Sequence, residues 1–284
     1  MKRYITALAV AAILTACNSD NDIIPDNTPV KMTFAISGDF HLDTHDFTRS
    51  LEADGKTMTD VWVLDYVGGE LKQQLHQTSD DADFGSPTMD LSLGTHHIYF
   101  IASRGAGASL NTTTHALTFT SVRDTFWKDY EVDVVSTSNG NRAVTLERVV
   151  AKLKLTVNDE IPAGAATLVC TPVTWYYGLN YRTGVPVTAT NAQAISISIP
   201  ANYVGTSGQL VASFFTISGT DEWTTDVSVA VKDGNGVSLG SAIINDAPML
   251  RNRSTEYSGN LFSGVGNMVV SINGDWASPY IGTW

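Results

Sequence analysis

Histidine is the residue type used most often for metal binding and proton transfer, and the chain has six copies. They lie at positions 41, 45, 76, 96, 97 and 115. No His-x-x-x-His pair falls on a predicted helix and there is no cysteine pair, so the sequence lacks the ligand spacing that is typical of zinc sites. His96 and His97 adjoin a predicted strand, where neighbouring side chains point to opposite faces. We therefore expect no metal site and no cofactor.

Three aspartates lie close together in a polar stretch, at Asp80, Asp81 and Asp83. Their oxygens suit calcium, but the run lacks the glycine and the distal glutamate of a calcium-binding loop, so we interpret it as a solvated acidic loop. Glycoside hydrolysis needs two carboxylates that face each other across a cleft, and spacing alone does not show such a pair. No catalytic residue is predicted, and we expect a protein that is not an enzyme.

Aromatic residues are a third candidate for chemistry, because their rings stack on sugars as well as pack in cores. The candidates are Trp175, Tyr176, Tyr177, Tyr181 and Trp223. Core and sheet packing explains them too, since aromatic residues are common in strands. Three or more coplanar, exposed rings would favour a surface lipoprotein that binds glycans for a nutrient-uptake system.

The first seventeen residues resemble a targeting signal. Lys2 and Arg3 are basic, residues 7–14 are apolar but too few to span a bilayer, and L-T-A-C ending at Cys17 matches the lipobox of bacterial lipoproteins. The match implies cleavage before Cys17 and its acylation, for example with palmitate, which gives firm anchoring. An ordinary signal peptide with a coincidental cysteine is the alternative.

Residues 18–29 are polar and acidic with two prolines, which is typical of a tether. An acidic run behind a lipidated cysteine also resembles the surface-export signal of some lipoproteins, although a solvated linker explains it equally well. The only other cysteine is Cys170, so a chain lipidated at Cys17 has no intrachain disulfide.

Composition narrows the function further. The chain has 284 residues, of which 43% are hydrophobic, a net charge of -12 and a pI of about 4.7. It is long enough to bury a real core. The acidity argues against binding to nucleic acid or to anionic membrane surfaces, because both need clustered Lys and Arg.

Alternating apolar residues predict short strands along most of the chain. Turn signals separate them, such as Gly68-Gly69 and the D-G-N-G run at residues 233–236. Only Val122, Phe126 and Tyr130 have helical spacing, which predicts a short helix. About seven strands in each half favour two β-sandwiches, and thus an all-β fold.

The stretch from Arg142 to Val157 sets the predicted domain boundary. Its second half has apolar residues at odd positions, namely Val149, Ala151, Leu153, Leu155 and Val157. In its first half Val144 and Leu146 are apolar, so the buried face changes near Glu147-Arg148, and a one-residue slip exchanges core for solvent. We interpret this point as a bulge or crossover between an N-terminal sandwich, residues 30–147, and a C-terminal sandwich, residues 148–284.

Several of these features together resemble the fimbrillin-like (FimA/FimB-type) subunits of type V pili. They are the lipobox, a first strand followed by a loop with an arginine, the run L-E-R-V-V-A-K-L at residues 146–153, and L-R-N-R-S-T-E-Y at residues 250–257 leading to G-N-L-F. The resemblance implies two tandem transthyretin-like β-sandwiches and a surface-exposed lipoprotein of the outer membrane and fimbrium that supports adhesion.

The resemblance also implies a mechanism of assembly. A protease cuts after an arginine in the first loop, the first strand leaves, and a donor strand from another pilus subunit fills the groove by β-strand addition. By position the cut falls at Arg49-Ser50, and the strand removed carries Val30, Met32, Phe34 and Ile36. Alternatively, Arg49 is an ordinary loop charge. The implied partners are other pilus subunits, the outer membrane through the lipid anchor, and ligands on host or bacterial surfaces.

The end of the chain departs from the pattern of a stalk subunit. Beyond residue 273 only eleven residues remain, and Pro279 interrupts them. A donor strand should be long and alternating, and proline has no N–H for a ladder. A stalk, anchor, accessory or accepting tip role therefore stays open.

Overall fold

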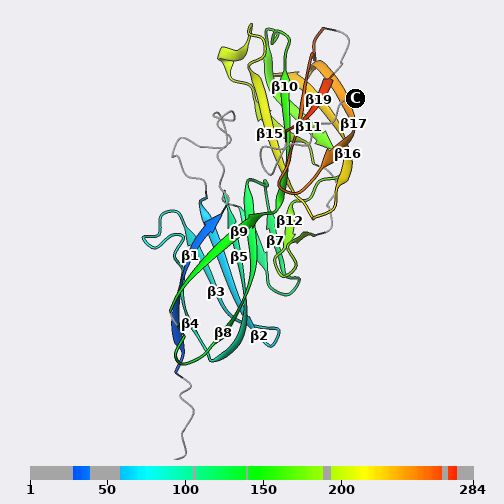
Figure 1. The fold of residues 1–284 in the computed structure, drawn as a ribbon. Helices are drawn as coiled ribbons and strands as arrows, with labels where there is room; N and C mark the ends of the chain where they lie inside the picture. Colours follow the sequence, from blue (N-terminus) through cyan, green and yellow to red (C-terminus); the bar gives the residue numbers. More distant parts are fainter. Residues whose placement is uncertain are drawn as a thin grey trace, which may run out of the picture.

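The computed structural model describes residues 28–38, 58–104, 107–138, 140–187, 193–263 and 268–273. Within these ranges the regular structure is strand, apart from the 3-10 helix η1 (Ala201–Tyr203). The molecule has two β lobes joined end to end, with further strands at the junction (Figure 1). The predicted all-β class, with sandwich domains in tandem, is confirmed.

The first sandwich uses strands from the first half of the chain. Its described strands are β1 (Val30–Gly38), β2 (Asp60–Val67), β3 (Glu70–Thr78), β4 (Thr88–Leu91), β5 (Gly94–Ser103), β8 (Thr125–Val134) and β9 (Asn141–Arg148). Their order is β3-β2-β5-β8-β9-β1-β4, and β1 and β9 run parallel. Two residue pairs alone link β8 to β9, so the sheet folds there into two layers.

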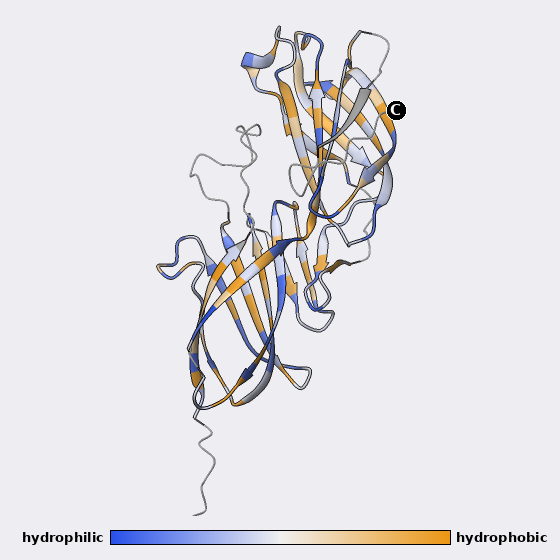
Figure 2. Cartoon of the chain, in the orientation of Figure 1, coloured by the Kyte–Doolittle hydropathy of each residue, from blue (hydrophilic) through white to orange (hydrophobic). Residues whose placement is uncertain are grey.

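The core of this sandwich lies between the two layers. Phe34 of β1 and Phe100 of β5 come from opposite layers, are fully buried, and have ring centroids 5.2 Å apart. Apolar residues run along the strands in Figure 2 as the alternating sequence pattern predicts. The Gly68-Gly69 turn between β2 and β3 has positive φ at both glycines, which a two-residue hairpin of this kind requires.

The second sandwich has two separate sheets. Its strands are β10 (Val150–Val157), β11 (Ala165–Pro172), β14 (Ile195–Ser198), β15 (Leu210–Ile217), β16 (Trp223–Asp233), β17 (Ser238–Met249), β18 (Ser254–Gly259) and β19 (Met268–Asn273). The sheet orders are β15-β10-β18-β19 and β14-β11-β16-β17, and β10 and β18 run parallel. Buried side chains of both sheets form one core.

The two sandwiches repeat one topology. In chain order, β1, β2, β3, β4, β5, β8 and β9 correspond to β10, β11, β14, β15, β16, β17 and β18. The ladder neighbours and their directions are the same, except that the short β8–β9 ladder has no counterpart between β17 and β18. In each, the first strand lies inside a layer and parallel to the last strand of the repeat. Among the described strands, β19 has no counterpart in the first sandwich.

Each sandwich also carries an inserted hairpin, and the two hairpins pair with each other. They are β6 (Ala108–Asn111) with β7 (Ala116–Phe119), and β12 (Gly178–Asn180) with β13 (Val185–Pro186). The order β13-β12-β7-β6 forms a small sheet at the junction of the lobes (Figure 1). Tyr181, which follows β12, bonds the Tyr66 hydroxyl at 2.7 Å and accepts the Trp127 indole N–H on its carbonyl at 2.6 Å. The small sheet therefore joins the two lobes.

The central stretch changes its buried face as its pattern predicts. Val144 and Leu146 are buried, and the next buried apolar residue is Val149, after which the odd positions of β10 stay buried. Val149 itself lies between β9 and β10, and its N–H donates to the carbonyl of Thr125 at 2.9 Å. The phase change thus coincides with the passage of the chain from one lobe to the other.

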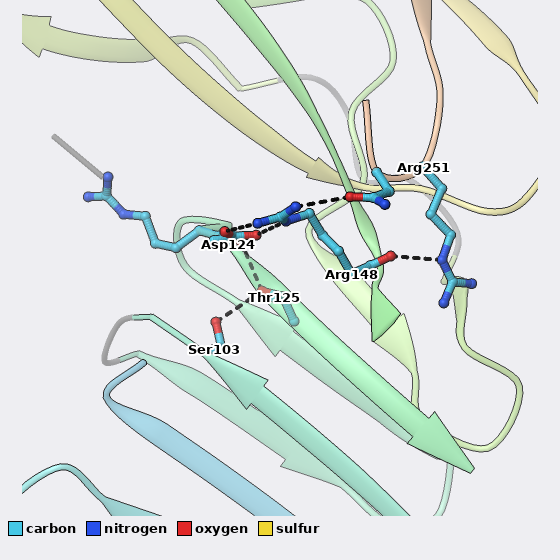
Figure 3. A network of polar contacts seen from close by, with 7 residues as sticks. Ser103, Asp124, Thr125, Arg148 and Arg251 are labelled. Carbon is cyan, nitrogen blue, oxygen red and sulfur yellow. Dashed lines mark hydrogen bonds and ion pairs between the residues drawn. The ribbon is translucent and has the colours of Figure 1, made fainter. Parts of the chain in front are cut away.

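Arg148 lies where the chain crosses from one lobe to the other, and only 5% of its surface is exposed. Its Nε and Nη2 donate to the two carboxylate oxygens of Asp124 at 2.8 and 3.0 Å, and its Nη1 donates to Asn252 at 3.0 Å. Arg251 donates to the carbonyl of Arg148 at 2.9 Å (Figure 3). Burial raises the pKa of Asp124, and the Arg148 guanidinium acts to lower it. One buried cation therefore connects the loop before β8 to the loop before β18.

The predicted helix at residues 122–130 is wrong. Residues 125–134 form β8, which pairs with β5 over ten positions. Phe126 and Tyr130 fit the spacing of a helix, but they also share a face with Val132 and Val134 in a period of two. Pairing with the buried central strand β5 stabilises the strand conformation over the helix, because tertiary contacts override local propensity.

Replacing Arg148 with alanine removes the cation partner of a partly buried carboxylate. We expect the free energy of unfolding to fall by about 1–3 kcal/mol at neutral pH, because the charge of Asp124 loses its two charge-assisted hydrogen bonds. The pKa of Asp124 then rises further in the folded state. An acid with a raised folded pKa contributes stability below its unfolded pKa and loses it as the pH rises. The loss should therefore be smaller near pH 4, as urea unfolding at both pH values will show.

Lys128→Ala is the matched control for this experiment. It breaks an ion pair with Glu147 that is largely exposed, and such pairs contribute less than about 1 kcal/mol. A pH-independent loss in the Arg148 variant, or an equal loss in the control, would contradict a stabilising role for the buried pair.

Candidate functional site

Strand β1 occupies a slot between two other strands. On one side it runs parallel to β9, with Thr33 opposite Asn141 and Gly38 opposite Leu146. On the other side it runs antiparallel to β4, with Val30 opposite Leu91. Past the end of that ladder, the N–H groups of residues 34 and 36 donate to the carbonyls of residues 87 and 85, each at 2.9 Å. The strand therefore satisfies backbone groups on both of its neighbours.

The side chains of β1 alternate between core and surface. Met32 and Phe34 are fully buried, Val30 and Ile36 are partly buried, and Lys31 is exposed. Phe34 packs edge-on against Phe100 and Tyr130. The residues predicted for the leaving strand thus lie together on one strand and face one core.

Removing β1 leaves an open slot. Burial of a Met or Phe side chain contributes about 1.5–3 kcal/mol, so exposure of the slot costs several kcal/mol before the lost ladders are counted. The approach on the β9 side is tight, because a Cβ on Gly140 would lie 2.6 Å from the Lys31 carbonyl oxygen. A strand that leaves this slot therefore needs a replacement of the same extended shape.

Other residues of the predicted site lie outside the described ranges. Cys17, Arg49 and Ser50 are among them, and so is the segment from residue 274 to the end. Lipidation at Cys17 and processing at Arg49 stay predictions. Of the two cysteines only Cys170 is described; it is free and buried, and burial raises its pKa to about 12.

The five aromatic candidates do not form an exposed platform. Trp175 and Tyr181 are fully buried, and Tyr176 stands at 84° to Trp223 with ring centroids 5.1 Å apart. This leaves Tyr177 as the remaining ring of the set, so no three of them are coplanar and exposed. Trp175 and Tyr177 nevertheless line one hollow beside residues 120–123.

The acidic loop and the paired histidines behave as structural groups. Asp81 accepts hydrogen bonds from the backbone and hydroxyl of Thr78, which closes the turn after β3. His96 is buried, whereas His97 faces Asp129 on the other side of the strand. No group of three or more His, Cys, Asp or Glu side chains within the described ranges is arranged to hold a metal.

One cluster, with Asp65 and His96 buried and Ser92 exposed, resembles a Ser-His-Asp triad that the sequence did not reveal. Nδ1 of His96 lies 2.6 Å from Oδ1 of Asp65, and its Nε2 lies 3.3 Å from Oγ of Ser92. Nε2 is also 2.9 Å from the Ser92 carbonyl oxygen, which only accepts hydrogen bonds. Nε2 therefore carries a proton and does not accept one from the hydroxyl. The cluster ties the end of β4 to β2 and β5 and does not activate a nucleophile.

A second pattern in the sequence also suggests a nucleophile. Residues 236–240, G-V-S-L-G, match the Gly-x-Ser-x-Gly spacing of a nucleophile elbow. That motif needs a sharp turn from strand to helix. Here Ser238 begins β17 after the β16–β17 hairpin and is exposed. The spacing is therefore part of a hairpin.

Two substitutions separate a structural cluster from a catalytic one. Ser92→Ala should change the free energy of unfolding by less than about 0.5 kcal/mol, because its side chain is exposed and its carbonyl stays in place. Asp65→Ala should cost about 3 kcal/mol, because it leaves His96 buried without its carboxylate. Denaturant titration measures both. Turnover of a p-nitrophenyl ester that disappears in the Ser92 variant would contradict the structural assignment.

Comparison with solved structures shows that the fold is shared by several proteins of Bacteroides. A proposed adhesin of Bacteroides ovatus is 13% identical over 90% of this chain and 95% of that one, with a TM-score of 0.52. A proposed polysaccharide-binding protein of Bacteroides thetaiotaomicron is 10% identical over 88% and 98%, with a TM-score of 0.52. A further proposed adhesin of that organism is 10% identical over 87% and 97%, with a TM-score of 0.51.

Identities this low show the fold alone. The comparison with curated proteins gave no match. Among the described residues, no helix has the length and apolar character needed to cross a bilayer. The sequence does match the family DUF6562, a family of unknown function, over residues 107–283. Because this match covers more than half of the chain, the protein belongs to that family.

Proposed function

We propose that the protein is a subunit or anchor of a type V pilus, a surface lipoprotein that assembles by β-strand exchange and supports adhesion. The observation that carries the proposal is the place of β1, an N-terminal strand inserted between β9 and β4. Its contacts are two backbone ladders and an alternating apolar face. Any extended segment of the same pattern can supply contacts of this kind.

Position in the chain makes β1 the strand that can leave. Its counterpart in the second sandwich, β10, occupies the same slot but continues into β9 on one side and β11 on the other. A single cut between β1 and β2 frees β1 from the rest of the sandwich, whereas β10 needs two cuts. The stretch between β1 and β2 contains Arg49-Ser50.

The deep burial of β1 is consistent with a strand that is replaced and not simply lost. A groove with two unpaired edges and an exposed apolar floor attracts other chains. A donor strand from another subunit restores both ladders and the burial contributed by Met32 and Phe34. The deep burial of β1 therefore favours exchange over simple loss.

Anchoring completes the proposal. Acylation at Cys17 would hold the precursor in the outer membrane, with residues 18–29 as a tether. Solved structures of the same fold include proteins described as adhesins, which supports a location at the cell surface. A subunit that keeps its lipid would act as an anchor, and one that is cut at Arg49 would enter the fibre.

Cleavage by an arginine-specific protease tests the first step. We expect the folded protein to be cut after Arg49, which gives a fragment with Ser50 as its N-terminus while the second sandwich stays intact. Arg49→Ala should abolish this fragment, and Arg142→Ala, on β9, should not. N-terminal sequencing and intact mass identify the product. Resistance at Arg49 together with cutting elsewhere would reject the processing step.

Strand exchange is tested on the cut protein. After the fragment that carries β1 is removed, a synthetic peptide of residues 28–38 should bind the open slot. A Phe34→Ala peptide should bind at least about tenfold more weakly, because it loses the aromatic contacts in the core, while a Lys31→Ala peptide should bind like the parent. Fluorescence anisotropy measures all three. Equal binding of the three peptides would contradict a register set by alternating burial.

A further inference from the structure

A hollow of about 280 Å³ lies where the two lobes meet. Its walls come from three places: the loop at residues 120–123 before β8, the loop at residues 175–177 after β11, and the facing edge strands β14 and β15. Ligand sites often lie at such junctions, and their volumes are typically roughly 300–1,000 Å³. The hollow is at the small end of that range, with room for one ring-sized group.

The seam of the first sandwich that corresponds to this hollow is closed by side chains. Edges β14 and β15 correspond to β3 and β4 of the first sandwich. There the seam is bridged by side chains, because Gln73 donates to the carbonyl of Asp90 at 2.5 Å and Gln77 donates to the carbonyl of Asp83 at 3.0 Å. In the second sandwich the corresponding seam holds the hollow instead.

The floor of the hollow is apolar and fixed. Val122, Trp175 and Phe214 are buried. The indole N–H of Trp175 donates to the carbonyl of Phe215 at 2.9 Å, which holds its ring in place. Trp175 is therefore a support beneath the site, and the half-buried rings of Tyr177 and Phe215 are the ones that a ligand can reach.

The rim of the hollow is polar and exposed. Thr120, Ser121 and Ser196 provide hydroxyls, Gln193 an amide and Arg123 a guanidinium. The described lining residues include no carboxylate, so nothing there selects a cation. Donors and acceptors around reachable aromatic rings suit a molecule that has both an apolar face and several hydroxyl groups.

Tyr177 connects the floor to the rim. Its hydroxyl is buried, and the backbone of Gln193 lies close to it. Burial raises the pKa of Tyr177, and the backbone of Gln193 opposes this rise. Tyr177 therefore offers a ligand the half-buried face of its ring and not its hydroxyl.

We propose that this hollow binds one pyranose ring of a glycan, with the apolar face of the sugar against Tyr177 or Phe215 and its hydroxyls toward Gln193, Ser196 and Arg123. The site would supply an adhesive contact. It depends on no step of strand exchange, so either proposal can fail without the other.

The test uses the full chain, with methyl glycosides of glucose, galactose, mannose, fucose and N-acetylglucosamine as probes in ligand-observed NMR and calorimetry. We expect saturable binding of at least one probe. The double variant Gln193→Ala, Ser196→Ala should weaken that binding at least about tenfold, because it removes exposed hydrogen-bonding groups and no core contact. Phe215→Ala should weaken it as well.

Gln74→Ala is the matched control, because it removes an exposed amide from β3 in the other lobe. Its affinity should equal that of the unmodified protein, and unfolding midpoints establish that each variant is folded. Absence of saturable binding for all five probes would overturn the proposal. Binding that is unchanged in the folded pocket variants, or equally weakened in the control, would overturn it as well.

Discussion

Backbone pairing of β1 is the constraint on which the first sandwich depends. A strand inside a layer has two ladders to satisfy, and its neighbours have groups that face it. Because β1 lies between β9 and β4, its absence would expose the edges of both and uncover the core beneath Phe34. The slot is therefore stable only when an extended chain fills it. Its contacts are backbone ladders and alternating side chains, which is why we propose that the chain in it is exchanged.

In the second sandwich, the first strand of the same topology is covalently connected to a strand at each end. β10 corresponds to β1 but follows β9 after Val149 alone, so the strand that we propose to be exchanged in one lobe is, in the other lobe, covalently joined to the strand before it. Arg148 and the paired hairpins β7 and β12 then hold the lobes together at this joint. Force on the second lobe is thus carried to the first through the chain at Val149, the Arg148–Asn252 hydrogen bond and a shared sheet.

Sequence pattern predicted the parts of this fold that depend on local alternation. The strands, the Gly68-Gly69 turn and the change of phase before Val149 all follow from it. It failed at β8, where Phe126 and Tyr130 fit both periods and only pairing with β5 decides between them. The hairpin partnership of β7 with β12, the Asp65–His96 pair and the hollow beside Tyr177 each join residues far apart in the sequence, and no local signal specifies such contacts.

The extent of the family match separates the two candidate activities. Residues 107–283 include β6 to β19, and with them both inserted hairpins and every described wall of the hollow. They exclude β1, its partner β4 and the stretch that contains Arg49. A property common to the family would then reside in the second lobe, its joint and the strands β8 and β9 of the first lobe, and the proposed ligand site lies within this range. Strand exchange at β1 would involve a part that precedes the match. The lobe proposed to exchange its first strand and the lobe proposed to bind a ligand are thus two copies of one topology.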